Sequence, residues 1–341
     1  GNIDELRMKE AQLEAQSERL GLTTEPLAGK FSRLFKEHFQ TAAVMAGIHL
    51  VQQGFQQVYQ NVSDVDAAMT ELKKVTDETD ATYSSFMQNA ESRASSLGAT
   101  LSDTINATAD FARLGFNIED ASNVSDAALI LKNVGDGISD VSDASEMLIS
   151  TMQAFDIKAS DTLKIVNEFN SAGNNFAISS DGVGEALKRS ASALATANNT
   201  MEESIALATT MNRVIQDPET VGTTLKTVSM YLRATKTELE ATGESAEGMA
   251  ETTSKLRDSL KALSHGQVDT FDEAKQEYKS TTELIKEMGA AWSSMSDKEK
   301  AAALELMGGK RNANAVSALI KNYQEIDKVI NTITNDTNSA I

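Results

Sequence analysis

The sequence predicts an all-α protein built from consecutive amphipathic helices and helical hairpins. Apolar residues recur at helical spacing along the chain of 341 residues, and helix-capping residues precede many of these runs. No stretch sustains the alternation of apolar and polar residues that is typical of a strand. Aromatic residues make up only 5% of the chain, a composition that suits thin helical layers better than one thick core.

Residues 1–62 are expected to form an N-terminal helical segment that mediates oligomerisation. Leu6, Leu13 and Leu20 recur every seven residues, but polar residues occupy the complementary core positions, so this first helix has only a weak coiled-coil seam. We interpret the aromatic residues that follow as candidate contacts with another copy or a hub protein, and core packing within the chain is an equally favoured alternative. These candidates are Phe31, Phe35, Phe39, Phe55 and Tyr59.

Residues 63–235 are expected to form a helical core, because the acidic, Ser/Thr-rich composition begins at Ser63. Within it, Gly115 is predicted to end one helix in a left-handed conformation, and Asn117 to cap the next. Capping residues followed by an acidic residue in the first turn predict further helix starts. These pairs are Ser63–Asp66, Asn117–Asp120, Thr200–Glu203 and Ser296–Glu299. Glycines near the ends of apolar runs are Gly98, Gly115, Gly173, Gly289 and the pair Gly308–Gly309.

Residues 236–270 are expected to be a mobile connection, because Lys236–Ala250 carries two glycines among many Glu, Thr and Ser residues. Residues 271–341 are expected to form the C-terminal helical part of the core. The single tryptophan, Trp292, lies among apolar residues at helical spacing, so we expect it in the core rather than on a contact surface.

The acidic charge is concentrated between Phe116 and Glu185. The whole chain has a net charge of -19, and this stretch has 12 acidic residues against three lysines, a net of -9. Nucleic-acid affinity depends on clustered Lys or Arg, so we expect no tight binding to nucleic acid. A solvated acidic face is the favoured interpretation, and an acidic docking surface is the alternative.

No motif predicts a catalytic, cofactor-binding or metal-ligating residue. The chain has no cysteine and three histidines, none in an H-E-x-x-H arrangement. "MGGKR" lacks the first glycine and the Ser/Thr of a phosphate-binding loop, and "DGISDVSDASE" lacks the central glycine of a calcium loop and instead predicts a helix start. Glu91-Ser92 partly resembles lytic transglycosylases, but the Gly-Leu-Met-Gln stretch of that family is missing, so a peptidoglycan-cleaving enzyme is the weakest alternative.

Five blocks of the sequence, taken in order, carry a family resemblance. They are "DFARLGFNIEDA" from Asp110, "MQAFDIKASDTLKIVNEFN" from Met152, "SAGNNFAISSDGVGEALKRSASALATANNTMEESIAL" from Ser171, "VGTTLKTVSMYLRA" from Val221 and "AAWSSMSDKEKAAALELMGGKRNANAVSALIKNY" from Ala290. From about Asp64 to Asn322 the chain thereby resembles the core region of phage tail tape measure proteins. A cytoplasmic helical scaffold or signalling module is the alternative.

The resemblance implies a structural protein without enzymatic activity or cofactor. Such a protein scaffolds the tail tube of a phage or tail-like injection particle, helps to set tail length and leaves at genome ejection. It is assembled in the cytoplasm of the bacterial host and lies in the tube lumen. The implied partners are the tail tube protein, baseplate or tip hub proteins and tail assembly chaperones, and self-association is expected.

The ends and the apolar runs add two expectations. The opening Gly1, in place of Met, favours an excerpted or processed polypeptide. The best apolar run, Thr41–Val51, is about half the ~20 residues that span a bilayer. The resemblance implies membrane contact only during ejection.

Overall fold

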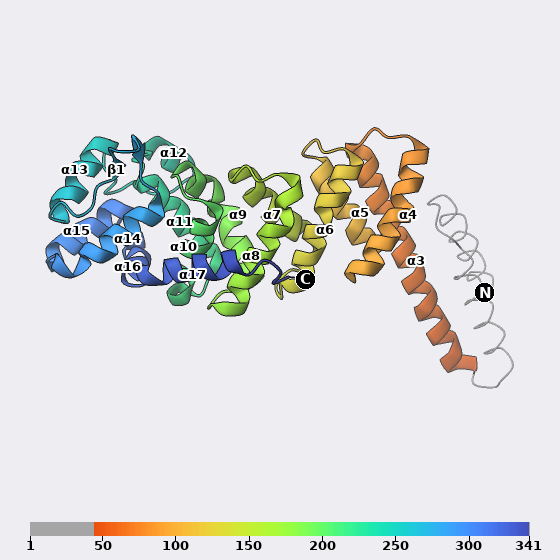
Figure 1. Ribbon diagram of the computed structural model, residues 1–341. Helices are drawn as coiled ribbons and strands as arrows, with labels where there is room; N and C mark the ends of the chain where they lie inside the picture. Colours follow the sequence, from red (N-terminus) through yellow and green to blue (C-terminus); the bar gives the residue numbers. More distant parts are fainter. Residues whose placement is uncertain (1–43, 341) are drawn as a thin grey trace. The chain divides into compact units, whose positions relative to one another are not determined.

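The computed structural model describes residues 44–340, and fifteen α-helices account for most of them (Figure 1). The prediction of an all-α fold is therefore confirmed. The only sheet in this range is one antiparallel pair, β1 (Phe271–Asp272) and β2 (Glu277–Tyr278), with Phe271 opposite Tyr278. The chain divides into two compact units, with the boundary after Leu129.

The first unit contains α3 (Val44–Val75), α4 (Asp80–Leu97), α5 (Leu101–Ala112) and most of α6 (Ile118–Val134). Helix α5 packs against both α3 and α4. The helix start predicted at Ser63 is wrong, because α3 continues through it. The apolar stripe of α3 continues at helical spacing across Ser63 and keeps one face of the helix buried. Its buried members include Val62, Val65, Met69 and Leu72. The expected boundary between residues 62 and 63 thus falls inside a continuous helix.

The predicted hairpin around Gly115 is confirmed. Gly115 has φ +92°, and its N–H donates to the carbonyl of Ala112 at 2.9 Å, which closes α5. The Asn117 side-chain oxygen then accepts the Asp120 N–H at 2.9 Å at the start of α6. Both contacts join residues three apart, so the local sequence suffices to specify them.

The second unit holds the end of α6 and the remaining elements. They are α7 (Val141–Ala154), η1 (Ala159–Asp161), α8 (Thr162–Asn175), α9 (Ser180–Thr196), α10 (Met201–Ile215), α11 (Pro218–Tyr231), α12 (Lys236–Ala241), α13 (Thr253–Leu263), α14 (Thr281–Ala291), η2 (Trp292–Ser294), α15 (Asp297–Gly308), η3 (Lys310–Asn312), α16 (Ala313–Lys321) and α17 (Tyr323–Asn335). Helix α9 contacts α7, α8, α10 and α11, so it lies at the centre of this unit. Its apolar stripe, including Leu187 and Leu194, is fully buried.

Helix caps follow the predicted pattern in this unit. Thr200 with Glu203 and Ser296 with Glu299 form reciprocal capping boxes, and a third, Ser280 with Glu283, escaped prediction. "DGISDVSDASE" is a helix start as predicted, because Asp140 caps α7.

Two of the glycines near the predicted helix ends lie in the last helical turn, where neighbouring elements approach closely. A Cβ on Gly173 would lie 2.7 Å from the Ser180 hydroxyl oxygen, and one on Gly289 would lie 2.3 Å from the Tyr323 ring. These positions therefore need glycine for close packing rather than for a turn.

Residues 236–270, expected to be a mobile connection, contain α12 and α13 and are packed in the second unit. Leu239, at 0% exposure, clusters with Tyr231 and Met249. The Tyr231 hydroxyl also lies 3.0 Å and 2.9 Å from the carbonyl oxygens of Ser245 and Glu247. Tyr231, which lies outside the segment, thus supplies an apolar partner that the composition of the segment does not reveal, and the mobility of the segment stays a prediction.

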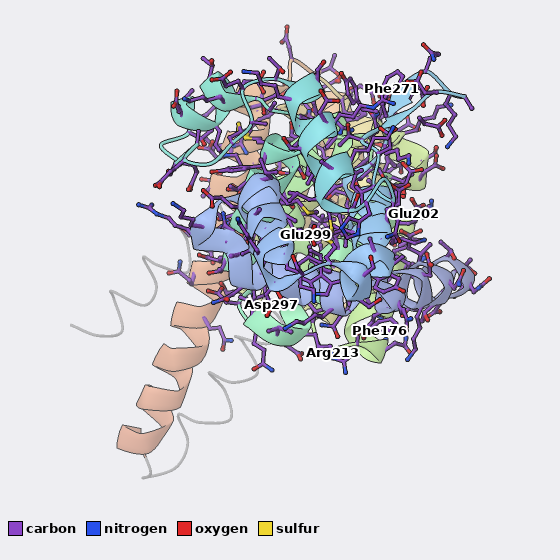
Figure 2. The ribbon with its side chains drawn as sticks, turned by 90° about the vertical axis from the view of Figure 1, so that its left-hand side faces the viewer. Phe176, Glu202, Arg213, Phe271, Asp297 and Glu299 are labelled. Atoms are coloured by element: carbon purple, nitrogen blue, oxygen red, sulfur yellow. The ribbon has the colours of Figure 1, made fainter. Side chains whose placement is uncertain are left out.

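Helix α17 lies along α10 and α8 (Figure 1). Arg213 of α10 pairs with Glu325 of α17, and the Lys328 ammonium lies 5.8 Å from the centre of the Phe176 ring; Figure 2 labels Arg213 and Phe176. Within residues 44–340, no helix combines the length and the apolar content that crossing a membrane requires.

Candidate functional site

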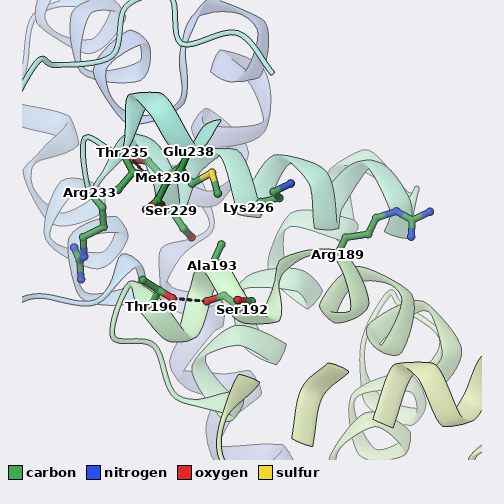
Figure 3. Close-up of a pocket in the computed structure, with 10 residues that line it drawn as sticks. All are labelled: Arg189, Ser192, Ala193, Thr196, Lys226, Ser229, Met230, Arg233, Thr235 and Glu238. Atoms are coloured by element: carbon green, nitrogen blue, oxygen red, sulfur yellow. Dashed lines mark hydrogen bonds between the residues drawn. The ribbon is translucent and has the colours of Figure 1, made fainter. Parts of the chain in front are cut away.

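A cleft between α9 and α11 is the candidate binding site (Figure 3). The two helices touch where a Cβ on Gly222 would lie 2.5 Å from the Ala186 carbonyl oxygen. Towards the C-terminal ends of both helices a cleft of about 180 Å³ opens. Its lining combines cations, hydroxyls and small apolar groups: Arg189, Ser192, Ala193, Thr196, Lys226, Ser229, Met230, Arg233, Thr235 and Glu238.

Cations in the cleft differ in how they are paired. Arg189 pairs with Glu185 and, at 2.9 Å, with Glu219. In contrast, no ion pair within residues 44–340 joins Lys226 or Arg233 to a carboxylate. The lining thus has three cations and the carboxylate of Glu238, and Arg189 is already paired with two carboxylates. Lys226 and Arg233 are the groups suited to a carboxylate or phosphate of a ligand.

Arg233 is the most constrained of these cations. Its Nη2 donates to the Lys279 carbonyl at 2.9 Å, and its guanidinium carbon lies 5.5 Å from the centre of the Tyr278 ring. Its Nη1 is buried without a hydrogen-bond acceptor, and burial lowers the pKa of Arg233. Leaving such a donor unsatisfied is costly, so the Lys279 carbonyl and the Tyr278 ring hold this side chain against that cost.

Hydroxyl groups in the cleft are engaged locally. Thr196 donates to the Ser192 carbonyl at 2.8 Å, and Thr235 donates to the Met230 carbonyl at 3.2 Å. The Ser229 hydroxyl shares a hydrogen bond with Thr281 at 3.3 Å. None of these bonds connects a hydroxyl to a base that would activate it, so the arrangement favours binding over nucleophilic chemistry.

A second unusual group is Glu168 on α8, which is only 2% exposed. The Lys164 ammonium lies 3.5 Å from one Glu168 oxygen and 2.6 Å from Glu202, while the other Glu168 oxygen is buried without a hydrogen-bond partner. Burial, with the nearby Glu202 charge, raises the pKa of Glu168 to about 7 against the attraction of Lys164. Because a substrate cannot reach a carboxyl this deeply buried, Glu168 is a structural group that titrates near neutral pH.

The side chains of the predicted contact residues lie outside the part of the chain that the structure describes. Phe31, Phe35 and Phe39 precede the described residues, and Phe55 and Tyr59 lie on α3 but their side chains are outside the description. Their role stays a prediction.

Trp292, expected in the core, is only half-buried, with the Lys300 ammonium 5.9 Å from the centre of its ring. Glu91, the residue that partly resembles a transglycosylase acid, is exposed on α4. In the part of the chain that the structure describes, no group of three or more His, Cys, Asp or Glu side chains is placed to hold a metal ion.

Sequence reasoning missed Asn199, which joins the corner between α9 and α10 to the start of α14. Its side-chain oxygen accepts the N–H and the hydroxyl of Thr282, both at 3.0 Å. Its amide donates to the Leu194 carbonyl at 2.8 Å and to the Thr281 hydroxyl at 3.1 Å. Its only sequence signal was its place beside the cap Thr200. A polar residue at such a corner is usually solvated, so nothing in the sequence marked Asn199 as buried.

One comparison with known proteins identifies a family for this chain. The model of the family described as phage-related minor tail protein matches residues 88–309, from α4 to the end of α15. No solved structure matches the chain at a significant level. Since the matched span covers well over half of the sequence, the chain belongs to the phage-related minor tail protein family and is a structural component of a phage tail.

Proposed function

We propose that this chain is a segment of a tape measure protein, which scaffolds assembly of the tail tube, helps to set tail length and leaves at genome ejection. The observation that carries the proposal is where the tape-measure-like blocks lie in the fold. The block from Asp110 forms the corner between α5 and α6, the block from Ser171 forms the α8–α9–α10 core, and the block from Ala290 spans α14 to α16. The resemblance thus lies at positions that determine the fold.

Surface chemistry supports a protein that must leave its partners. Among the described residues, the exposed large hydrophobic side chains are Leu114, Val214 and Tyr278. Permanent interfaces generally bury broad apolar areas, whereas polar contacts exchange more readily. A mostly polar helical surface therefore suits temporary contact with the tube wall.

The proposed partners are the tail tube protein, the baseplate or tip hub proteins and the tail assembly chaperones. The proposed location is the tube lumen after assembly in the host cytoplasm, with membrane contact only during ejection. The match to the phage-related minor tail protein family counts against the alternative of a cytoplasmic scaffold or signalling module.

Intact tails should protect this chain from added protease, and particles triggered to eject should lose it. A closed tube excludes the protease, whereas a released protein leaves the particle. Quantitative mass spectrometry of peptides from residues 44–340 measures both effects. A protein on the outer tail surface, digested in both samples, is the control. Digestion in intact tails, or full retention after ejection, would contradict the proposal.

Residues 31–62 are proposed to mediate association with another copy or a hub protein. Replacing Phe35 and Phe39 by Ser should weaken self-association, because both changes remove apolar contact area, while helix content beyond Ser63 stays intact. Sedimentation velocity and far-ultraviolet circular dichroism measure the two properties. Leu114→Ser, which makes an exposed apolar residue polar elsewhere, is the matched control. Unchanged association of the double variant would refute this role.

A further inference from the structure

Three asparagines lie on one face of α8. Asn167, Asn170 and Asn174 are three and four residues apart, a spacing that aligns side chains along a helix. Asn167 and Asn170 are only 6% and 7% exposed. Buried amides require partners, so their contacts show what this face recognises.

Asn167 contacts the main chain of the segment that follows α17. Its amide nitrogen donates to the Thr337 carbonyl at 2.7 Å, and its side-chain oxygen accepts the Ala340 N–H at 3.1 Å. One side chain thus holds a main-chain acceptor and a main-chain donor three residues apart.

Asn170 and Asn174 contact Ser339, which lies between Thr337 and Ala340. The Asn170 amide donates to the Ser339 carbonyl at 2.5 Å and lies 3.0 Å from its hydroxyl, which the Asn174 amide also approaches at 3.2 Å. The Ser180 hydroxyl donates to the Asn170 side-chain oxygen at 3.0 Å. The start of α9 therefore helps to orient the Asn170 amide.

Helix α17 delivers the segment to this face. Its apolar residues Ile326, Val329 and Ile333 are buried, and α17 contacts both α10 and α8. A tethered segment has a high effective concentration at its site, so modest hydrogen bonds suffice to hold it.

We propose that Asn167, Asn170 and Asn174, here called the asparagine ladder, form a docking site for a polypeptide backbone, and that the occupant is Thr337–Ala340 of the same chain. Three of the five bonds go to main-chain atoms, and the other two go to the Ser339 hydroxyl. The ladder therefore fixes where the polypeptide leaves α17. This inference does not depend on the tape measure proposal.

Hydrogen exchange of the full chain, followed by mass spectrometry, tests the ladder. The double variant Asn167→Ala with Asn174→Ala removes two of the three asparagines. It keeps Asn170, whose side-chain oxygen also accepts the Ser180 hydroxyl. Exchange at residues 336–340 should become about tenfold faster, while α10 exchanges unchanged. Asn175→Ala is the matched control, because Asn175 bonds within its own helix to the Ser171 carbonyl. Unchanged exchange at residues 336–340 in the double variant would overturn the proposal.

A variant of the occupant tests the same contact without altering α8. Ala340→Pro removes the N–H that Asn167 accepts, whereas Ala340→Ser keeps it. The proline variant should speed exchange at residues 337–339, and the serine variant should not. Asn167→Ala should have a smaller effect in the proline variant than in the parent, because only its bond to the Thr337 carbonyl is then left to lose. Fully additive effects would show that Asn167 and Ala340 do not interact, which contradicts the ladder.

Protein concentration and salt identify the occupant and the nature of the contact. Protection of residues 336–340 should be independent of protein concentration, because the occupant belongs to the same chain. Protection that rises with concentration would assign the occupant to a second copy and overturn the proposal in its stated form. Because amides are neutral, protection should also persist in about 1 M NaCl, and its loss would show that charges hold the segment instead.

Discussion

Deletion of residues 116–185 should abolish tail assembly rather than produce shorter tails. The deletion removes α6, α7, η1, α8 and the first six residues of α9. The remainder of α9 would lose α7 and α8 as packing partners, and apolar residues of α9 that the intact unit buries would become exposed to water. Losing the partners of several core residues costs more than the roughly 5–15 kcal/mol that stabilises a typical domain.

The opposite outcome has a calculable size. If these 70 residues formed one straight helix that measured length, their removal would shorten each tail by roughly 105 Å at ~1.5 Å per residue. Electron microscopy of particles from the deletion strain measures tail yield and length together. Glu119→Gln with Glu146→Gln, two exposed changes in the same segment, should leave both normal. A normal yield of tails shorter by the calculated amount would show that these residues measure length directly.

Replacing Glu168 by Gln should stabilise the protein above neutral pH. In the unfolded chain Glu168 loses its proton near its ordinary pKa of 4.5, whereas in the fold it does so near 7. Between these pH values the folded state binds the proton more tightly than the unfolded state does. The stabilisation that protonated Glu168 contributes therefore falls as pH rises and is fully lost above the folded pKa. Glutamine imitates the protonated form of Glu168. The variant should therefore have a free energy of unfolding higher than that of the parent by on the order of 3 kcal/mol at about pH 8.

Urea unfolding of both proteins at several pH values measures this difference. At about pH 4 the variant and the parent should have nearly equal stability, because Glu168 is then protonated in both states. Glu219→Gln is the matched control: this carboxylate pairs with Arg189 but is 66% exposed, so water screens the pair and little change is expected at any pH. A Glu168→Gln variant that is less stable than the parent at about pH 8 would mean that the Lys164 ion pair outweighs burial.

The sequence by itself determined the helical class, many helix ends and the family. Gly115 and the boxes Thr200–Glu203 and Ser296–Glu299 act through contacts within one helical turn, so local residue types specify them. Ser63 shows the limit of such signals, because a capping pattern inside a continuous apolar stripe starts no helix. The aromatic residues predicted as contacts stay a prediction.

Only the tertiary structure decided which polar groups face one another. Asn167 meets Thr337 across 170 residues, and Asn199 meets Thr282 across 83. In the sequence, such an asparagine cannot be distinguished from a solvated one. Whether Arg233 meets a carboxylate, and how far burial raises the pKa of Glu168, depend likewise on which helices cover these side chains. Hydrogen bonding and burial of polar groups depend on neighbours that only folding brings together, whereas caps and apolar stripes depend on neighbours that the chain already provides.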